Sequence, residues 1–112
     1  MSKILSKSDA SKILSNVPLE DAFQFCTADG VYTKISAISL EDFVDKLDGV
    51  DAISLLFHYP RGDFQAWIRD IVGDRELADK MCFILRDISG ENLRQELIKM
   101  VEKRISELKA IK

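Results

Sequence analysis

The sequence predicts an α+β fold: a mainly helical single domain with one N-terminal β-hairpin and a long C-terminal amphipathic helix. Three observations lead to this prediction. Residues 23–36 hold two runs of alternating apolar and polar side chains, joined by Asp-Gly. Residues 40–85 hold four segments with apolar residues at helical spacing, each preceded by Ser or Asp. Residues 89–110 continue that spacing for about six turns.

Length and composition bound the architecture and the partners. A chain of 112 residues matches the commonest size of one domain, so we expect residues 1–112 to fold as a single unit. The net charge is −3 and no run of Lys and Arg interrupts it, which disfavours nucleic acid as a partner. Because no long apolar stretch or export signal is present, we expect a cytoplasmic protein with no membrane partner.

A loose end followed by a short helix is predicted at the N-terminus. Residues 1–7 are expected to form a loose end. Ser8 then suits a helix N-cap, Ile13 and Leu14 follow as apolar residues, and Pro18 prevents the helix from continuing. A helix of about two turns needs tertiary support.

The hairpin is the clearest local signal in the chain. Phe23 and Phe25 alternate with polar residues, and a second alternating run begins at Val31. Asp29-Gly30 between the two runs is a favoured hairpin turn. A lone hairpin is marginally stable in water, so its apolar face is expected to pack on the helices that follow.

The next two helices are predicted from caps and apolar spacing. Ser39 with Asp42 resembles a capping box, and Gly49 is expected to end that helix. Asp51 is expected to cap the following one, which should end before Pro60. That helix is apolar on most sides, so we expect it to be the most buried, with these core residues: Ile53, Leu56 and Phe57.

Two further helices are predicted to meet at a sharp turn. Asp63 is expected to cap the first, Gly73 to end it in a left-handed conformation, and Asp74 to cap the second. The apolar stripe of the first is Phe64, Trp67, Ile68, Ile71 and Val72, and that of the second is Leu77, Ala78, Met81, Cys82 and Leu85.

The C-terminal helix, residues 89–110, allows two interpretations. Its apolar stripe spans fewer than three heptads, which favours packing on its own domain. The alternative is a projecting helix that binds a protein partner or a second copy of the chain. The stripe consists of Leu93, Leu97, Met100, Val101, Ile105 and Leu108.

No residue pattern indicates catalysis. His58 is the only histidine, which excludes mechanisms that need a histidine pair and a two-histidine zinc site. Cys26 and Cys82 lack the CxxC spacing of a metal knuckle, and both are expected to pack as small hydrophobic residues. Phosphate-binding glycine loops and calcium-loop spacing are also absent from the sequence. We therefore expect no enzyme activity, no cofactor and no metal.

One polar segment remains a candidate contact site for a ligand or partner. His58, Arg61, Asp63 and Trp67 lie within ten residues of each other. The structural interpretation makes His58 a hydrogen-bonded residue, Asp63 a helix cap and Trp67 a core residue. The alternative is a polar cluster that faces a carboxylate or phosphate. The Arg-Gly-Asp triplet at 61–63 is not interpreted as an adhesion motif in a cytoplasmic chain.

Residues 23–83 resemble an uncharacterised, mostly archaeal family of small prokaryotic domains of unknown function. The shared features are an aromatic strand, a Gly turn, a Ser-Leu helix start, an aromatic-His pair, then Asp-Phe, Trp-Ile, Gly-Asp and Leu-Ala. These features fall at Phe23, Phe25, Gly30, Ser39, Leu40, Phe57, His58, Asp63, Phe64, Trp67, Ile68, Gly73, Asp74, Leu77 and Ala78. Where the family often has Asn before Asp-Phe, this chain has Gly62.

The resemblance implies an accessory or interaction role, because family members occur both alone and as modules of larger chains. Some lie near sugar-metabolising enzymes. We therefore expect a non-catalytic protein-interaction or accessory module. The alternative is a small-molecule sensor or accessory subunit for a sugar or sugar phosphate, with the surface at His58 and Arg61 as its site.

Overall fold

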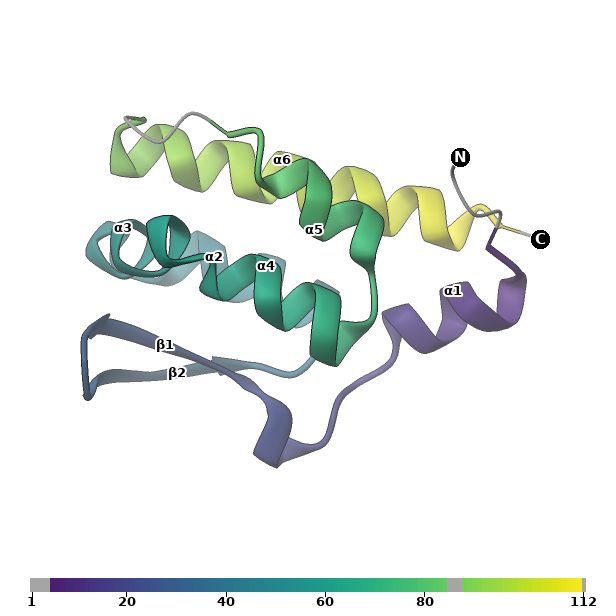
Figure 1. Ribbon diagram of the computed structural model, residues 1–112, viewed down its shortest axis with the longest axis horizontal. Helices are drawn as coiled ribbons and strands as arrows, with labels where there is room; N and C mark the ends of the chain where they lie inside the picture. Colours follow the sequence, from purple (N-terminus) through teal and green to yellow (C-terminus); the bar gives the residue numbers. More distant parts are fainter. Residues whose placement is uncertain (1–4, 85–87, 112) are drawn as a thin grey trace.

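The computed structural model describes residues 5–84 and 88–111, and it confirms the α+β class with one N-terminal hairpin and a long C-terminal helix. Figure 1 shows the hairpin as one layer, α2, α3 and α4 above it, and α5 and α6 as a third layer. In chain order the elements are α1 (Lys7–Leu14), η1 (Leu19–Asp21), β1 (Phe23–Ala28), β2 (Val31–Ala37), α2 (Leu40–Gly49), α3 (Ala52–Arg61), α4 (Asp63–Trp67), the π-helical η2 (Ile68–Val72), α5 (Arg75–Met81) and α6 (Gly90–Lys109).

The hairpin packs its aromatic side on the helices, as the alternation predicts. β1 and β2 pair antiparallel around the Asp29-Gly30 turn. The rings of Phe23 and Phe25 lie 4.9 Å apart, and Phe23 also lies 5.1 Å from Phe64 of α4. Aromatic pairs at these separations add packing energy beyond area burial. The aromatic cluster between the two layers consists of Phe23, Phe25, Phe43, Phe64 and Trp67.

α6 packs along its own domain with its apolar side inward. It contacts α2 and α3 in the middle layer, α5 beside it and α1 near its C-terminal end. Ser89 caps it by accepting a hydrogen bond from the Asn92 amide. The apolar stripe predicted for α6 therefore belongs to the core; its buried members are Leu93, Leu97, Val101, Ile105 and Leu108.

The start of the first helix differs from the prediction. Ser6, not Ser8, is the N-cap, and it forms a reciprocal capping box with Asp9. Residues that were expected to be a loose end thus include the cap and the first helical residue, Lys7. Ser8 is acceptable as a cap by type, but only Ser6 has an acidic side chain three residues on.

α3 buries a different face from the one predicted, and it is not buried on most of its sides. Ile53 and Leu56 are 58% and 44% exposed, and Phe57 is half-buried. The buried residues are instead Ser54, Leu55, His58 and Tyr59. Hydrophobicity alone does not decide burial in this helix, because His58 and Tyr59 can be buried when their polar atoms find hydrogen-bond partners. The Tyr59 hydroxyl, for example, lies 2.9 Å from the Met81 carbonyl oxygen and 2.7 Å from that of Ile84.

α3 also continues past Pro60, to Arg61, although it was predicted to stop before the proline. Pro60 lies in the last turn, where its missing N–H removes a single hydrogen bond, to the carbonyl of Leu56. Gly62 then ends the helix in the left-handed region, with φ of 76°.

The junction of α4, η2 and α5 confirms two predicted features and corrects two. Gly73 has φ of 91°, and Asp74 caps α5 by accepting from the Leu77 amide. Ile71 is exposed because the Gly73 amide donates to the carbonyl of Ile68, five residues back, and this wider turn shifts the stripe. The position at the start of α4 is Gly62, so Asp63 is not its cap.

The two cysteines are less buried than predicted, and one stripe position cannot be assessed. Cys82 is exposed and Cys26 is half-buried, so neither is a core residue. Leu85, the last residue of the predicted stripe, lies outside the described residues.

Gly90 marks a close approach between α6 and α3. A Cβ atom at this position would lie 2.8 Å from the Cβ of Ala52. We therefore expect Gly90→Ala to lower the free energy of unfolding by about 1–3 kcal/mol through overpacking. Chemical denaturation of the wild type and the variant measures this. The double variant Gly90→Ala/Ala52→Gly should recover part of the loss; no recovery would contradict the steric explanation.

Candidate functional site

His58 is buried and both of its ring nitrogens are hydrogen-bonded within the chain. It lies on α3 facing β1 and is 4% exposed. The backbone N–H of Cys26 donates to Nε2 over 2.8 Å, and Nδ1 lies 2.9 Å from a carboxylate oxygen of Asp63. Because a backbone N–H can only donate, Nε2 must be the unprotonated nitrogen, so Nδ1 carries the proton and donates to Asp63. These contacts define one neutral tautomer.

Arg61 extends this arrangement to the tip of the hairpin. Its Nε donates to Asp63 over 3.0 Å, and a terminal guanidinium nitrogen donates to Asp29 over 3.0 Å. The guanidinium also lies 4.6 Å from the centroid of the Phe57 ring. The residues His58, Arg61, Asp63 and Asp29 with the Cys26 amide are hereafter called the hairpin clamp. It links α3 and α4 to β1 and to the hairpin turn.

An irregularity in β2 accompanies the clamp. Phe25 pairs with Ile35 but the next residue, Cys26, pairs with Tyr32, so β2 contains two extra residues at this point. One of them, Lys34, has φ of 68°, the left-handed conformation found in some bulges. Here a side chain takes the place of backbone–backbone hydrogen bonds between the strands: the Thr33 hydroxyl donates to the Phe25 carbonyl over 2.8 Å. The strand pairing is thus broken opposite the amide that His58 holds.

Trp67, the fourth candidate, lies apart from the clamp. Its ring is 5.8 Å from that of Phe23, on whose ring His58 also packs at 4.8 Å. Trp67 is 6% exposed, and its Nε1–H donates to the Asp21 carbonyl over 2.8 Å. The structure therefore brings together three of the four predicted site residues, of which only Arg61 and Asp63 reach solvent.

The electrostatics of the clamp keep His58 neutral and Cys26 protonated. Burial lowers the pKa of His58, and the nearby Asp63 only partly opposes this effect. Burial also raises the pKa of the Cys26 thiol, with Asp63 acting in the same direction. Nε2 cannot take up a proton or bind a metal ion without losing the Cys26 contact, and Nδ1 already carries the proton that it donates to Asp63. In this arrangement His58 has a structural role: its two hydrogen bonds fix the Cys26 amide and the Asp63 carboxylate in place.

The clamp predicts a pH dependence of stability. An unfolded chain has a histidine pKa of about 6.5, so below that pH the unfolded state takes up a proton that folded His58 resists. The contribution of His58 is therefore present above that value and lost as the pH falls toward its lowered folded pKa. We expect the gap in unfolding free energy between wild type and His58→Gln to shrink between about pH 7.5 and 5.

Urea unfolding at several pH values measures this gap, and other titrating groups cancel in the difference. Gln is the matched replacement because it keeps one donor and one acceptor but does not titrate. A gap that stays constant over this range would show that the clamp does not depend on the neutral imidazole.

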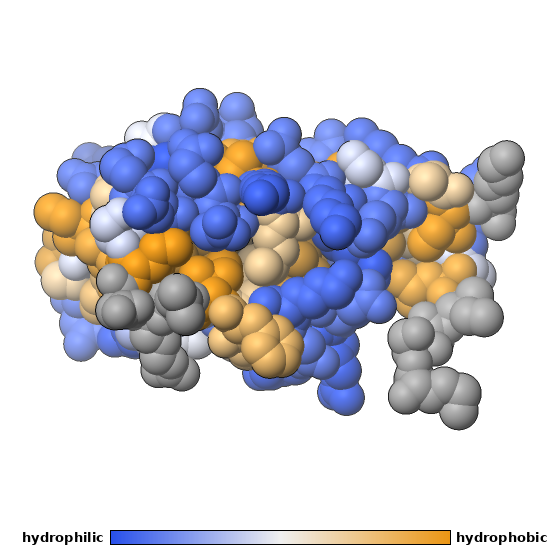
Figure 2. Space-filling model, turned by 90° about the horizontal axis from the view of Figure 1, so that it is seen from above, coloured by the Kyte–Doolittle hydropathy of each residue, from blue (hydrophilic) through white to orange (hydrophobic). Residues whose placement is uncertain are grey.

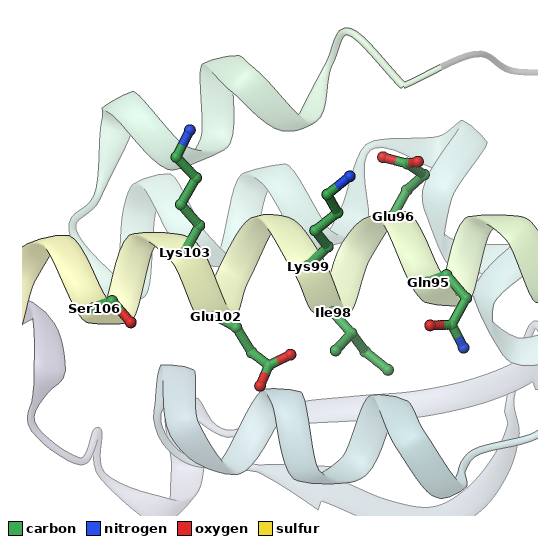
Figure 3. Close-up of a pocket in the computed structure, with 7 residues that line it drawn as sticks. All are labelled: Gln95, Glu96, Ile98, Lys99, Glu102, Lys103 and Ser106. Carbon is green, nitrogen blue, oxygen red and sulfur yellow. The ribbon is translucent and has the colours of Figure 1, made fainter.

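Two surface hollows on α6 were not anticipated from the sequence. Figure 3 shows the first, an open depression of about 590 Å³ on the outer face of α6. The second, of about 360 Å³, lies between α5 and α6 and is hereafter called the α5–α6 groove. Its lining residues are Leu77, Lys80, Phe83, Glu96, Lys99, Met100, Lys103, Arg104 and Glu107. Phe83 is a large apolar residue that lies off the apolar stripe predicted for residues 77–85, and this is the sequence signal that could have identified it.

The described residues form neither a cluster of metal-ligand side chains nor a membrane-spanning helix. Within residues 5–84 and 88–111, no three His, Cys, Asp or Glu side chains come together as metal ligands would. None of the helices in the same part of the chain is both long enough and apolar enough to cross a membrane.

Comparison with protein families identifies the family that residues 23–83 resemble. The model of DUF5752, a family of unknown function, matches residues 20–112. The chain belongs to DUF5752. The match extends beyond residues 23–83, so the DUF5752 domain comprises the hairpin and every described helix after it, α6 included. α1 precedes the matched range. No curated protein and no solved structure matches the chain.

Proposed function

We propose that this DUF5752 domain is a non-catalytic interaction or accessory module that binds a protein partner. The observation that carries the proposal is Phe83, which is 84% exposed directly after α5 and forms one wall of a groove. Ile53 and Leu56 on α3 are also exposed, and Figure 2 shows, on the molecule seen from above, apolar surface at the left and a second apolar patch at the right. Exposed apolar side chains of this size mark interaction surfaces when they cluster.

The clamp supports the non-catalytic part of the proposal. His58 is the imidazole that a catalytic mechanism would use, and its two nitrogens are engaged by Cys26 and Asp63. A general base needs a free lone pair within reach of its substrate. The position of Phe83 supports partner binding beside α6, since the apolar stripe of α6 itself is covered by its own domain.

A photo-crosslinking residue at position 83, introduced in the cells that encode the protein, tests this proposal. The matched control places the same residue at Leu19, which is also apolar and 78% exposed but lies on η1. We expect a discrete cross-linked protein from position 83 only, and competition by the unlabelled chain. Equal labelling from both positions would contradict a defined interaction surface.

A second candidate function is recognition of a small anionic molecule such as a sugar phosphate. One observation favours it: a crevice of about 240 Å³ beside Arg61 is lined by Arg69 and by Gln65. The Oε1 atom of Gln65 is buried with no hydrogen-bond partner among the described residues. His58, Asp63 and Trp67 are not among the lining residues of this crevice, so only Arg61 carries over from the predicted site.

Thermal-shift measurements with sugars, sugar phosphates and nucleotides separate the two functions. A ligand that binds the folded chain raises the melting temperature by linkage, and Arg61→Gln/Arg69→Gln should abolish that shift. A shift of this kind, together with no cross-linked protein from position 83, would favour the second function over the first.

A further inference from the structure

The α5–α6 groove has an apolar floor and an apolar wall. Among its lining residues, Leu77 of α5 is buried, Met100 of α6 is half-buried, and Phe83 after α5 is exposed. Phe83 contributes almost its whole ring to solvent, so a partner that covers it removes a large apolar area from water. Two helices side by side also present the surface ridges on which a third helix packs.

The rim of this groove carries unpaired positive charge. Figure 3 shows Lys99 and Lys103 pointing from α6 toward α5. Neither forms an ion pair with any residue in the part of the chain that the structure describes. The two lysines are four residues apart on one helix face, an arrangement that costs about 0.2–0.5 kcal/mol in an isolated helix. Carboxylates supplied from outside the chain would remove this repulsion.

The other charges along the groove leave its middle cationic. Arg104 is engaged by Asp74 and Glu76, so it is neutralised within the domain. Lys80 lies 3.7 Å from Glu76 and remains half-exposed on the α5 side. The groove also contains Glu96 and Glu107, the first and last of its α6 residues, with both lysines between them. This local charge contrasts with the net charge of −3 of the chain.

We infer that the α5–α6 groove binds an acidic amphipathic helix of a partner protein, with apolar anchors on Phe83 and Met100 and carboxylates on Lys99 and Lys103. The inference rests on the proposed function and names the partner's chemistry. Helix-in-groove recognition places anchors at i, i+3 or i+4, and i+7. α5 has 7 residues and is about 10 Å long, which matches the two turns that such anchors span.

Binding of synthetic peptides to the intact chain tests the inference. The probe is a labelled helical peptide of about 15 residues, roughly four turns, with Leu and Phe on one face and Glu elsewhere. Its matched control has Lys in place of every Glu. Fluorescence anisotropy should show saturable binding of the acidic peptide only, and weaker binding as salt rises from about 0.05 to about 0.5 M.

Variants then locate the site. We expect Phe83→Ser, and separately Lys99→Glu/Lys103→Glu, to weaken binding at least about tenfold, since both change central contacts. Lys7→Glu/Lys12→Glu on α1 changes the net charge equally, and Leu19→Ser removes an equally exposed apolar side chain; both should stay within about twofold. All substituted side chains are exposed, and unchanged melting temperatures verify folding.

Several results would overturn the inference. Equal affinity for the acidic and basic peptides, or an affinity that Phe83→Ser leaves unchanged, would do so. Tighter binding to vesicles containing phosphatidylserine would show that the ligand of the groove is a membrane surface and not a helix. A solution mass that rises with concentration, and no longer does so in Phe83→Ser, would show that the ligand is a second copy of the chain. A cross-linked partner with no acidic helix would overturn this inference but leave the proposed function intact.

Discussion

A chain that ends at position 87, and so lacks α6, is expected to be an unfolded monomer. The truncation removes four apolar side chains that are at most 1% exposed: Leu93, Leu97, Val101 and Leu108. Loss of each such side chain costs about 2–5 kcal/mol, so the total of about 8–20 kcal/mol is as large as the 5–15 kcal/mol by which a domain of this size is typically stable. α2 also loses Arg94, which donates to the carbonyl oxygens of Leu47 and Val50 at its C-terminal end.

Circular dichroism and light scattering on the truncated and full-length chains check this result. The matched control removes the other end: a chain that starts at residue 20 lacks α1 but keeps the whole DUF5752 match. α1 buries only Ala10 and Ile13, so this control should remain folded with reduced stability. A folded monomer without α6 would show that α6 is an association element and not part of the core.

The substitution Arg104→Ala is expected to lower the free energy of unfolding by about 3–5 kcal/mol. Arg104 makes a bidentate contact with Asp74 at 2.7 and 3.0 Å, and Asp74 is 2% exposed. The same carboxylate caps α5 through the Leu77 amide. The substitution leaves this carboxylate buried without its counter-charge, and the desolvation cost of that charge is then uncompensated.

Denaturant unfolding measures this change, and the chain provides a control for a surface pair. Lys109 lies 3.2 Å from Glu41, but both side chains are more than half exposed. Lys109→Ala should cost no more than about 1 kcal/mol, because solvent screens the exposed pair. Arg104→Met separates lost packing from lost charge. It keeps much of the packing but leaves the Asp74 carboxylate without its counter-charge, so it should remain strongly destabilising. Equal small losses in all three variants would contradict a dominant buried charge pair.

Local signals were sufficient to predict most elements of the fold. The Asp29-Gly30 hairpin, the Ser39 and Ser89 caps and the left-handed Gly73 all depend on residues close in sequence. These features form in the same way wherever the segment is placed, which is why pattern and cap rules recover them. The C-terminal helix was predicted at 89–110 and is observed at Gly90–Lys109.

Asp63 shows where such rules fail. Asp51 and Asp74 precede apolar runs and do cap their helices, through the Ile53 and Leu77 amides. Asp63 has the same sequence context, but its carboxylate instead contacts His58 and Arg61. The Arg61 guanidinium carries a full positive charge, whereas a helix N-terminus presents only partial charges, and Asp63 and its two partners become neighbours only after α3 folds. A one-dimensional pattern contains no information about that competition.

Sequence proximity was sufficient to place three of the four candidate site residues together, but not to predict what they contact. His58, Arg61 and Asp63 come together as their sequence proximity suggested, yet the partner that decides the state of the imidazole is a strand amide 32 residues away. Asp29 likewise reaches Arg61 only through the hairpin fold. Phe83, Lys99 and Lys103 were not identified because they become neighbours only when α5 packs against α6.

The hairpin clamp has a consequence for how the protein behaves at high concentration. A two-stranded sheet has two open edges, and unpaired backbone groups along an edge are templates for strand addition by another chain. On β1 the imidazole of His58 occupies the amide of Cys26, and on β2 the left-handed Lys34 interrupts the strand with a charged residue. Each edge is therefore interrupted near its middle, which protects the folded chain against edge-to-edge aggregation.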